Sequence, residues 1–258
     1  MAGTGRCADD LIGSVPAAPF RSLLSEAVVK PILALEHVGV AYPRGRGLRH
    51  RDHFWALEDV SLSLCSGETL GVVGRNGVGK TTLLRVIAGI IDPDRGSIHN
   101  AGIRASMLSL QVGFVNQLTG RENAILSGML LGAPRARIEA VMDEIVAFSE
   151  LEAFIDEPVG SYSAGMKARL GFSVAMQADP DVMLIDEVLG VGDTHFRKKS
   201  AEAIRQRIRS DRTVILVSHN VGMMKDLCDR VVWIEQGRSC MEGEASEVLE
   251  AYEASSLS

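Results

Sequence analysis

The chain of 258 residues has few cysteines, and their spacing excludes two kinds of protein. Cys7, Cys65, Cys228 and Cys240 lie far apart in the sequence. They show neither the paired spacing of a zinc site nor the density of a disulfide-stabilised domain. We therefore expect free thiols in a reducing cytoplasm.

The chain also lacks a surplus of basic residues and any long apolar run. Its formal net charge is -6, whereas proteins that grip a phosphate backbone need an excess of Lys and Arg. No segment approaches the ~20 apolar residues that span a bilayer. Arg6 is followed by Asp9 and Asp10, with no apolar stretch long enough for a signal peptide. We therefore expect no nucleic-acid partner, and a membrane role only through other proteins.

The composition that is present is ordinary for a globular protein, with 46% hydrophobic and 23% charged residues, and it suffices for one large domain. Residues 1–31 have no clear apolar period, so we expect an N-terminal extension, partly disordered or with a short helix around Leu23 to Val29. The main domain is expected over residues 32–243. A C-terminal helix and tail are expected over residues 244–258.

Strand and helix patterns alternate along the main domain. The apolar run from Ile32 to Tyr42 predicts a strand, and the basic stretch Arg44 to Arg51 predicts a surface loop before the strand pattern resumes at Trp55. Apolar spacing within residues 121–149 predicts helices, in a helical subdomain of about residues 118–178. Short apolar strands separated by helical segments then predict a mostly parallel sheet. These strands are Val182 to Ile185, Thr213 to Val217 and Val231 to Ile234.

A glycine-rich loop follows the strand pattern Thr69 to Val73 and precedes the helical pattern Lys80 to Ala88. Glycines in such a loop let successive backbone N–H groups converge on phosphates at a helix N-terminus. Lys80 is expected to reach the β and γ phosphates, the Thr81 hydroxyl to bind Mg²⁺, and the Thr82 backbone to bind another phosphate oxygen. A glycine-rich turn that binds nothing is the weaker interpretation. The loop reads Gly74, Arg75, Asn76, Gly77, Val78, Gly79, Lys80, Thr81.

Two acidic residues end the apolar strand Val182 to Ile185. Asp186 at such a strand end can lie near a metal ion through water, while Glu187 faces the γ phosphate as the general base. Two solvated carboxylates after a buried strand are the alternative. The phosphate loop upstream in the same chain favours the catalytic interpretation.

A third motif, Tyr162 to Arg169, reads Tyr-Ser-Ala-Gly-Met-Lys-Ala-Arg and opens a helical segment. Together with the two motifs above, it resembles the ATP-binding cassette family over about residues 32–243. The resemblance implies an α/β fold: a P-loop NTPase core with a mostly parallel sheet, an antiparallel β subdomain and an inserted helical subdomain. It also implies that Ser163 and the Gly165 backbone contact the γ phosphate of ATP held by a second subunit. Ala164 and Met166 depart from the commonest signature, and a plain helix cap at Ser163 is the alternative.

The same resemblance implies roles for further polar residues. Asp193 would lie in the loop that crosses the dimer interface. His219 would be the switch that bonds to the γ phosphate, with a solvated or structural histidine as the alternative. Either Gln111 or Gln117 would link Mg²⁺ to the surface that contacts the membrane subunit, and we favour Gln111.

An aromatic residue is expected to stack on adenine, because a flat ring offers dispersion and π contact to a base. By resemblance this residue is Tyr42. The insertion that follows makes Trp55 a rival, and the alternative for Tyr42 is a ring that closes a strand over the core.

Three stretches resemble the part of the family that exports O-antigen, capsule or teichoic-acid polymers: Leu118 to Asn123, Tyr162 to Leu170 and Asp186 to Asp193, in which Val188 replaces the usual proline. This resemblance implies an ATP-hydrolysing subunit that uses ATP and Mg²⁺ and closes head to tail as a homodimer. It further implies integral membrane permease subunits, a lipid-linked glycan as indirect substrate, and a peripheral position on the cytoplasmic face of the bacterial inner membrane. Because the chain ends at Ser258 without a carbohydrate-binding extension, we expect the membrane subunit or another protein to recognise the polymer.

Other functions fit parts of the same pattern. The ATPase subunit of a lipid or drug exporter would share every motif named above. A soluble cassette protein of DNA repair or translation would need two cassettes, or a long coiled-coil or basic insertion, and neither appears in the sequence. A nucleotide-binding regulator without turnover is disfavoured by the presence of Glu187 and His219.

Overall fold

The computed structural model describes residues 30–44, 52–108, 113–186 and 193–256. The helix predicted around Leu23 to Val29 and most of the loop predicted over Arg44 to Arg51 lie outside these residues.

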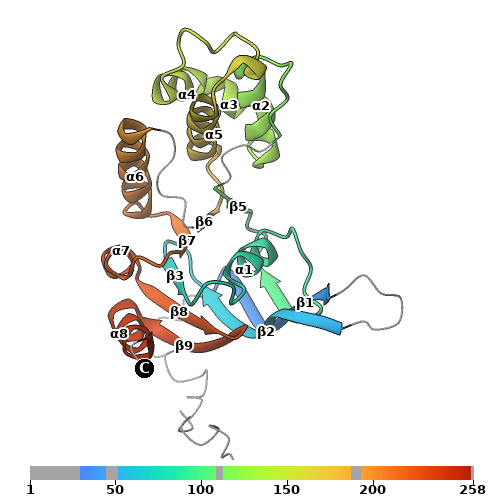
Figure 1. The fold of residues 1–258 in the computed structure, drawn as a ribbon, viewed down its shortest axis with the longest axis vertical. Helices are drawn as coiled ribbons and strands as arrows, with labels where there is room; N and C mark the ends of the chain where they lie inside the picture. The colour runs from blue at the N-terminus through green and yellow to red at the C-terminus, as the bar shows by residue number, and fades with distance from the viewer. Residues whose placement is uncertain (1–29, 45–51, 109–112, 187–192, 257–258) are drawn as a thin grey trace, which may run out of the picture. The chain divides into compact units, whose positions relative to one another are not determined.

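The described residues form one nine-stranded mixed sheet with the strand order β4-β1-β2-β9-β8-β3-β7-β6-β5 (Figure 1). Parallel pairing joins β8, β3, β7, β6 and β5, and antiparallel pairing joins β4, β1 and β2. The strands are β1 (Leu33–Arg44), β2 (Asp52–Leu64), β3 (Thr69–Val73), β4 (Arg95–Asn100), β5 (Ala105–Met107), β6 (Val182–Asp186), β7 (Thr213–Val217), β8 (Arg230–Glu235) and β9 (Arg238–Glu244).

The parallel part of the sheet is the buried centre of the fold. Every residue of β3 and of β7 is buried, as expected for parallel strands that are covered on both faces. The strands predicted at Val182 to Ile185, Thr213 to Val217 and Val231 to Ile234 are confirmed as β6, β7 and β8.

The antiparallel part extends the sheet with long strands. In β1 and β2, Leu33 pairs with Leu64 and Tyr42 with Phe54, with register shifts between these pairs. β4 is exposed along most of its length, and so has no apolar alternation that would predict it from the sequence.

Helices surround the sheet and also form a separate group. α1 (Lys80–Ile87) follows β3, and α2 to α5 precede β6, so the helices predicted within residues 121–149 are confirmed. The group α2 to α5 has its own apolar core, which includes Ile138, Ile145 and Leu170. The remaining helices are α2 (Gly120–Leu130), α3 (Arg135–Ala140), α4 (Met142–Ser149), the short 3-10 helix Val159–Ser161, α5 (Ala164–Ala178), α6 (Thr194–Ile208), α7 (Val221–Leu227) and α8 (Ala245–Ser256).

The C-terminal helix α8 packs on the sheet. Val248 and Leu249 are fully buried in the same apolar cluster as strand residues of β7 and β8, and the ring of Tyr252 meets Trp233 edge to face at 5.8 Å. The residues from Ala245 onward therefore complete the core.

Two expectations drawn from what the sequence lacks can be compared with the structure. Cys65, Cys228 and Cys240 are free thiols, and burial raises the pKa of Cys228 to about 12. Within the described ranges, no helix is both long and apolar enough to cross a membrane.

Candidate active site

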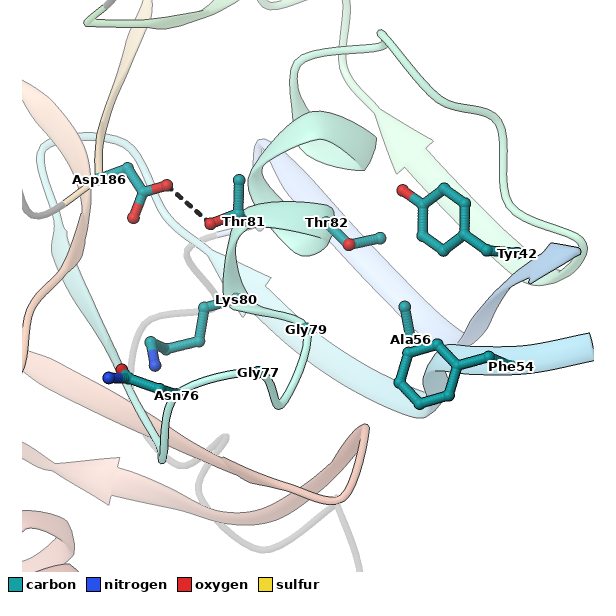
Figure 2. A pocket seen from close by; sticks show the side chains of 10 residues that line it. All are labelled: Tyr42, Phe54, Ala56, Asn76, Gly77, Gly79, Lys80, Thr81, Thr82 and Asp186. Carbon is teal, nitrogen blue, oxygen red and sulfur yellow. Dashed lines mark hydrogen bonds between the residues drawn. The ribbon is translucent and has the colours of Figure 1, made fainter. Parts of the chain in front are cut away.

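A pocket of about 430 Å³ opens at the edge of the sheet where β3 and β6 end (Figure 2). Parallel strands direct their carboxyl ends to one edge, which is where ligands bind in open α/β sheets. Residues from β1, β2, the glycine-rich loop, α1 and β6 line it: Tyr42, Phe54, Ala56, Asn76, Gly77, Gly79, Lys80, Thr81, Thr82 and Asp186.

The glycine-rich loop lies tight against neighbouring backbone. A Cβ at Gly74 would lie 2.2 Å from the carbonyl oxygen of Ile234, and one at Gly79 would lie 2.2 Å from that of Ala56. Gly79 also has a φ of 103°, which other residues rarely adopt. The loop therefore needs glycine here to turn into α1 and present its N–H groups to the pocket.

Lys80 supplies a positive charge at the base of the loop. Its Nζ donates hydrogen bonds to the carbonyl oxygens of Gly74 at 2.7 Å and Arg75 at 2.9 Å, and the residue is only 8% exposed. The ammonium group is thus held between the loop and the pocket at the N-terminus of α1. A cation and a helix N-terminus at one point favour a bound anion.

Two oxygen-bearing side chains meet beside Lys80. Thr81 Oγ1 donates a hydrogen bond to Asp186 Oδ2 at 2.9 Å, which joins the start of α1 to the end of β6 (Figure 2). Hard oxygen atoms are the ligands that Mg²⁺ prefers. Elsewhere in the described chain, His, Cys, Asp and Glu form no cluster of three that could hold a metal ion. The pair therefore fits an ion that takes most of its ligands from phosphate and water.

An aromatic wall lies at the far end of the pocket from Asp186. Tyr42 of β1 and Phe54 of β2 are directly paired across the strands, and both line the pocket. Phe54 is 48% exposed, and the buried hydroxyl of Tyr42 has no hydrogen-bond partner among the described residues. Trp55, considered from the sequence as a rival to Tyr42, does not line the pocket; its ring lies 3.6 Å below the guanidinium of Arg95. Phe54 was missed, because only the strand register assigns it to this face.

The residues expected to act across a dimer interface lie at the N-termini of two other helices. Ser163 caps α5, where its Oγ accepts a hydrogen bond from the Met166 N–H at 3.2 Å, and Gly165 follows in the first turn. Asp193 caps α6, where its Oδ1 accepts hydrogen bonds from the N–H groups of His195 and Phe196 at 3.0 Å each. Neither cap belongs to the pocket of its own chain.

His219 lies at the same sheet edge as Asp186 without lining the pocket. It follows β7 closely, and the last residue of that strand, Val217, pairs with Asp186. The side chain is exposed.

The structure describes one of the two glutamines that compete for one role. Gln117 is exposed in the turn before α2 and does not line the pocket. Gln111 and the proposed base Glu187 lie outside the described residues, so their roles stay predictions.

Known proteins are similar to this chain in sequence. Residues 57–190 match the family model described as ABC transporter. The chain belongs to the ABC transporter family. It is 47% identical over 199 residues to the O-antigen export system ATP-binding protein RfbB of Klebsiella pneumoniae, covering 77% of this chain and 81% of that one. It is 42% identical over 201 residues to the teichoic acids export ATP-binding protein TagH of Enterococcus faecalis, covering 78% of this chain and 45% of that one.

Solved structures of ABC ATPases have the same fold. A dimeric ATP-binding cassette in a post-hydrolysis state, bound to ADP and Pi, superposes with a TM-score of 0.64 at 21% identity, covering 83% of this chain and 98% of that one. An ATP-binding subunit of an ABC transporter superposes with a TM-score of 0.67 at 22% identity, covering 86% and 93%. The predicted fold class is thus confirmed. The ABC family binds ATP, and this chain is an ATP hydrolase of the ABC type.

Proposed function

We propose that this ABC ATPase drives export of a lipid-linked polysaccharide, such as O-antigen, capsule or teichoic acid, from the cytoplasmic face of the bacterial inner membrane. The support is its sequence identity of 47% to RfbB of Klebsiella pneumoniae over most of both chains. RfbB is named as part of an O-antigen export system. The similarity to TagH, named for teichoic acid export, points to the same chemical class of cargo. Integral membrane permease subunits would supply the path through the bilayer.

The pocket fits the phosphates of ATP at one end and its base at the other. Lys80 and the N–H groups of the glycine-rich loop would hold the β and γ phosphates. Thr81 and Asp186, already in contact at 2.9 Å, would hold Mg²⁺, Asp186 through water. The ion, when bound, neutralises charge on the β- and γ-phosphate oxygens. Tyr42 and Phe54 would provide the flat apolar surface on which adenine packs.

The residues expected to act on the γ phosphate follow the strand ends at this edge. Glu187, directly after Asp186, would remove the proton from the attacking water as general base. His219, after β7, would donate a hydrogen bond to a γ-phosphate oxygen. Gln111 would connect the metal site to the surface that meets the permease.

Two copies of the chain would be needed to complete each site. The exposed Ser163 and the neighbouring Gly165 stand at the N-terminus of α5, outside the pocket of their own chain. In a head-to-tail homodimer they would meet the γ phosphate held by the partner, and the α5 N-terminus would favour that anion. A cassette of the same fold has been solved as a dimer with ADP and Pi.

A co-purification experiment tests this function. The tagged full chain is recovered from detergent-solubilised membranes, its partners are identified by mass spectrometry, and the ATPase rate of the assembly is measured. We expect a multi-span permease encoded among glycan-synthesis genes, with ATP hydrolysis abolished by Lys80→Ala. Cells that lack the chain should lose the surface polymer and regain it with the wild-type gene but not with Lys80→Ala.

Other partners would contradict the proposal in different ways. A permease with no link to glycan synthesis, and a surface polymer that survives loss of the chain, would indicate export of another lipid or a drug. Recovery of nucleic acid or ribosomes without a permease would indicate a soluble cassette protein.

A further inference from the structure

Three helices that are separate in the sequence meet through their aromatic rings. Phe148 of α4, Phe172 of α5 and Phe196 of α6 pack with ring centroids 5.7 to 5.8 Å apart, and Phe196 meets both others edge to face. Phe172 and Phe196 are fully buried. Rings in this geometry attract one another beyond the area that they bury, so the three helices are held as one unit.

A cluster of charges, centred on Glu150, joins the same helices. Glu150 ends α4 in the left-handed conformation, and its carboxylate accepts hydrogen bonds from Lys199 Nζ at 2.8 Å and Arg169 Nη1 at 3.3 Å. His195 Nδ1 lies 3.8 Å from the carboxylate. The hydrogen bond from Lys199 is the main reason that the pKa of Glu150 is lowered. One carboxylate therefore contacts cationic groups from two further helices.

Lys199 reinforces the connection to α4. Its Nζ also donates to the carbonyl oxygen of Phe148 at 3.0 Å and lies 4.7 Å from the centre of that ring. The ammonium group is thus shared between a carboxylate, a carbonyl and an aromatic face, all near the end of one helix.

The partners of Glu150 lie on the two helices capped by Ser163, expected to contact ATP held by the second subunit, and by Asp193, expected in the loop that crosses the dimer interface. Arg169 is on α5, which Ser163 caps, and Lys199 is on α6, which Asp193 caps. Each cap is bonded to the backbone of its own helix. A shift between α5 and α6 would therefore shift one cap relative to the other.

We propose that Glu150 is a positioning residue that locks α5 to α6, so that Ser163 and Asp193 approach the partner protomer in one fixed arrangement. This inference rests on the proposed head-to-tail dimer. Glu150 does not line the nucleotide pocket, so we expect the binding of ATP to a single chain not to depend on it. Its effect falls on the closed dimer, where both caps must fit at once, and small misplacements in such a site are costly.

The test compares Glu150→Gln with a matched control, Asp156→Asn, in the full chain. Both substitutions remove one carboxylate charge at nearly constant size. Asp156 also pairs with an arginine, Arg121 of α2, at 2.8 and 3.2 Å, and this ion pair includes no residue of α5 or α6. Fluorescent ATP binding to dilute protein, steady-state KM and kcat, and thermal unfolding are measured for each variant.

We expect Glu150→Gln to lower kcat about tenfold while ATP binding to dilute protein is unchanged, and Asp156→Asn to leave both unchanged. Glu150→Asp, which keeps the charge, should recover part of the loss. The double variant Glu150→Gln with Lys199→Met should lose less than the sum of the two single losses, because both substitutions remove the hydrogen bond between Lys199 and Glu150.

Several results would overturn the inference. One is a kcat for Glu150→Gln equal to that of wild type, and another is an equal loss of kcat in Asp156→Asn, which would indicate a general effect on stability. If wild type neither binds nor hydrolyses ATP, the proposed function fails and the inference with it. If wild type is active and Glu150→Gln is equally active, only the inference fails.

Discussion

At the residue scale, alternation along β2 decides which aromatic side chain reaches the nucleotide pocket. Phe54 and Ala56 face the pocket (Figure 2). Trp55, between them, instead packs against the guanidinium of Arg95. Adjacent residues of similar size thus have different surroundings, because successive side chains of a strand point to opposite faces. Substitutions of Phe54 and Trp55 can therefore be compared to test which ring contacts the nucleotide.

We predict that Phe54→Ala raises the KM for ATP about fivefold or more, since loss of one stacking ring costs roughly 1–3 kcal/mol. Steady-state ATPase assays measure the effect. The control is Trp55→Ala, which removes the next aromatic ring in the chain, 37% exposed against 48% for Phe54, and should leave KM near wild type. A larger rise in KM for Trp55→Ala than for Phe54→Ala would contradict the position assigned to the base.

At the element scale, the stretch Leu118 to Asn123 builds the start of α2. Thr119 and Glu122 form a capping box, in which each side chain bonds to the backbone of the other residue. A Cβ at Gly120 would lie 2.3 Å from the Tyr162 hydroxyl. The sequence of this stretch resembles that of ABC family members that export polymers. In the structure its residues have local packing roles.

Asn123 is the strongest anchor of this element. It is fully buried; its Oδ1 accepts from the Val115 N–H at 2.7 Å, and its Nδ2 donates to the carbonyl oxygens of Val115, Leu118 and Thr119 at 2.9 to 3.0 Å. Asn123→Ala would leave buried backbone groups without partners. We predict a loss of about 2 kcal/mol in the free energy of unfolding, measured by urea denaturation.

Asn116→Ala is the control for this prediction. Asn116 lies in the same loop but is exposed, and its Oδ1 accepts a 3.3 Å hydrogen bond from Nζ of Lys167 on α5. Its substitution should change the free energy of unfolding by no more than about 0.5 kcal/mol. Equal losses for the two variants would show that burial of Asn123 is not what stabilises the loop.

The elements themselves differ in how well the sequence predicts them. Local apolar patterns predict the buried strands β3, β6 and β7 and the helices within residues 121–149. A strand buried on both faces has a continuous apolar run, and a helix buried on one face has apolar residues at helical spacing. The exposed strand β4 leaves no such trace. The junction at Glu150 also leaves none, since it depends on contacts between helices far apart in the chain.

The site shows the same division. The phosphate loop is predictable because its chemistry needs consecutive residues, from Gly74 to Thr81. Phe54 is not, because only the pairing of β1 with β2 brings it opposite Tyr42. The contact between Thr81 and Asp186 lies between these cases: the two motifs are recognisable separately, and the parallel sheet brings them together.

At the scale of the whole molecule, one chain holds a phosphate-binding pocket at one place and the Ser163 cap at another. We therefore expect ATP to join two copies of the chain. ATP would supply contacts between the protomers that ADP lacks, so hydrolysis would release the closed dimer and move the attached permease.

The most direct test of this claim is the mass of the Glu187→Gln chain in solution, measured by light scattering with and without Mg·ATP. The substitution should preserve ATP binding and block hydrolysis, so that the closed dimer accumulates. We predict a mass near 27.7 kDa without nucleotide and about twice that with Mg·ATP. Adding Lys80→Ala should abolish the change. A chain that binds Mg·ATP and keeps a mass near 27.7 kDa would contradict the account.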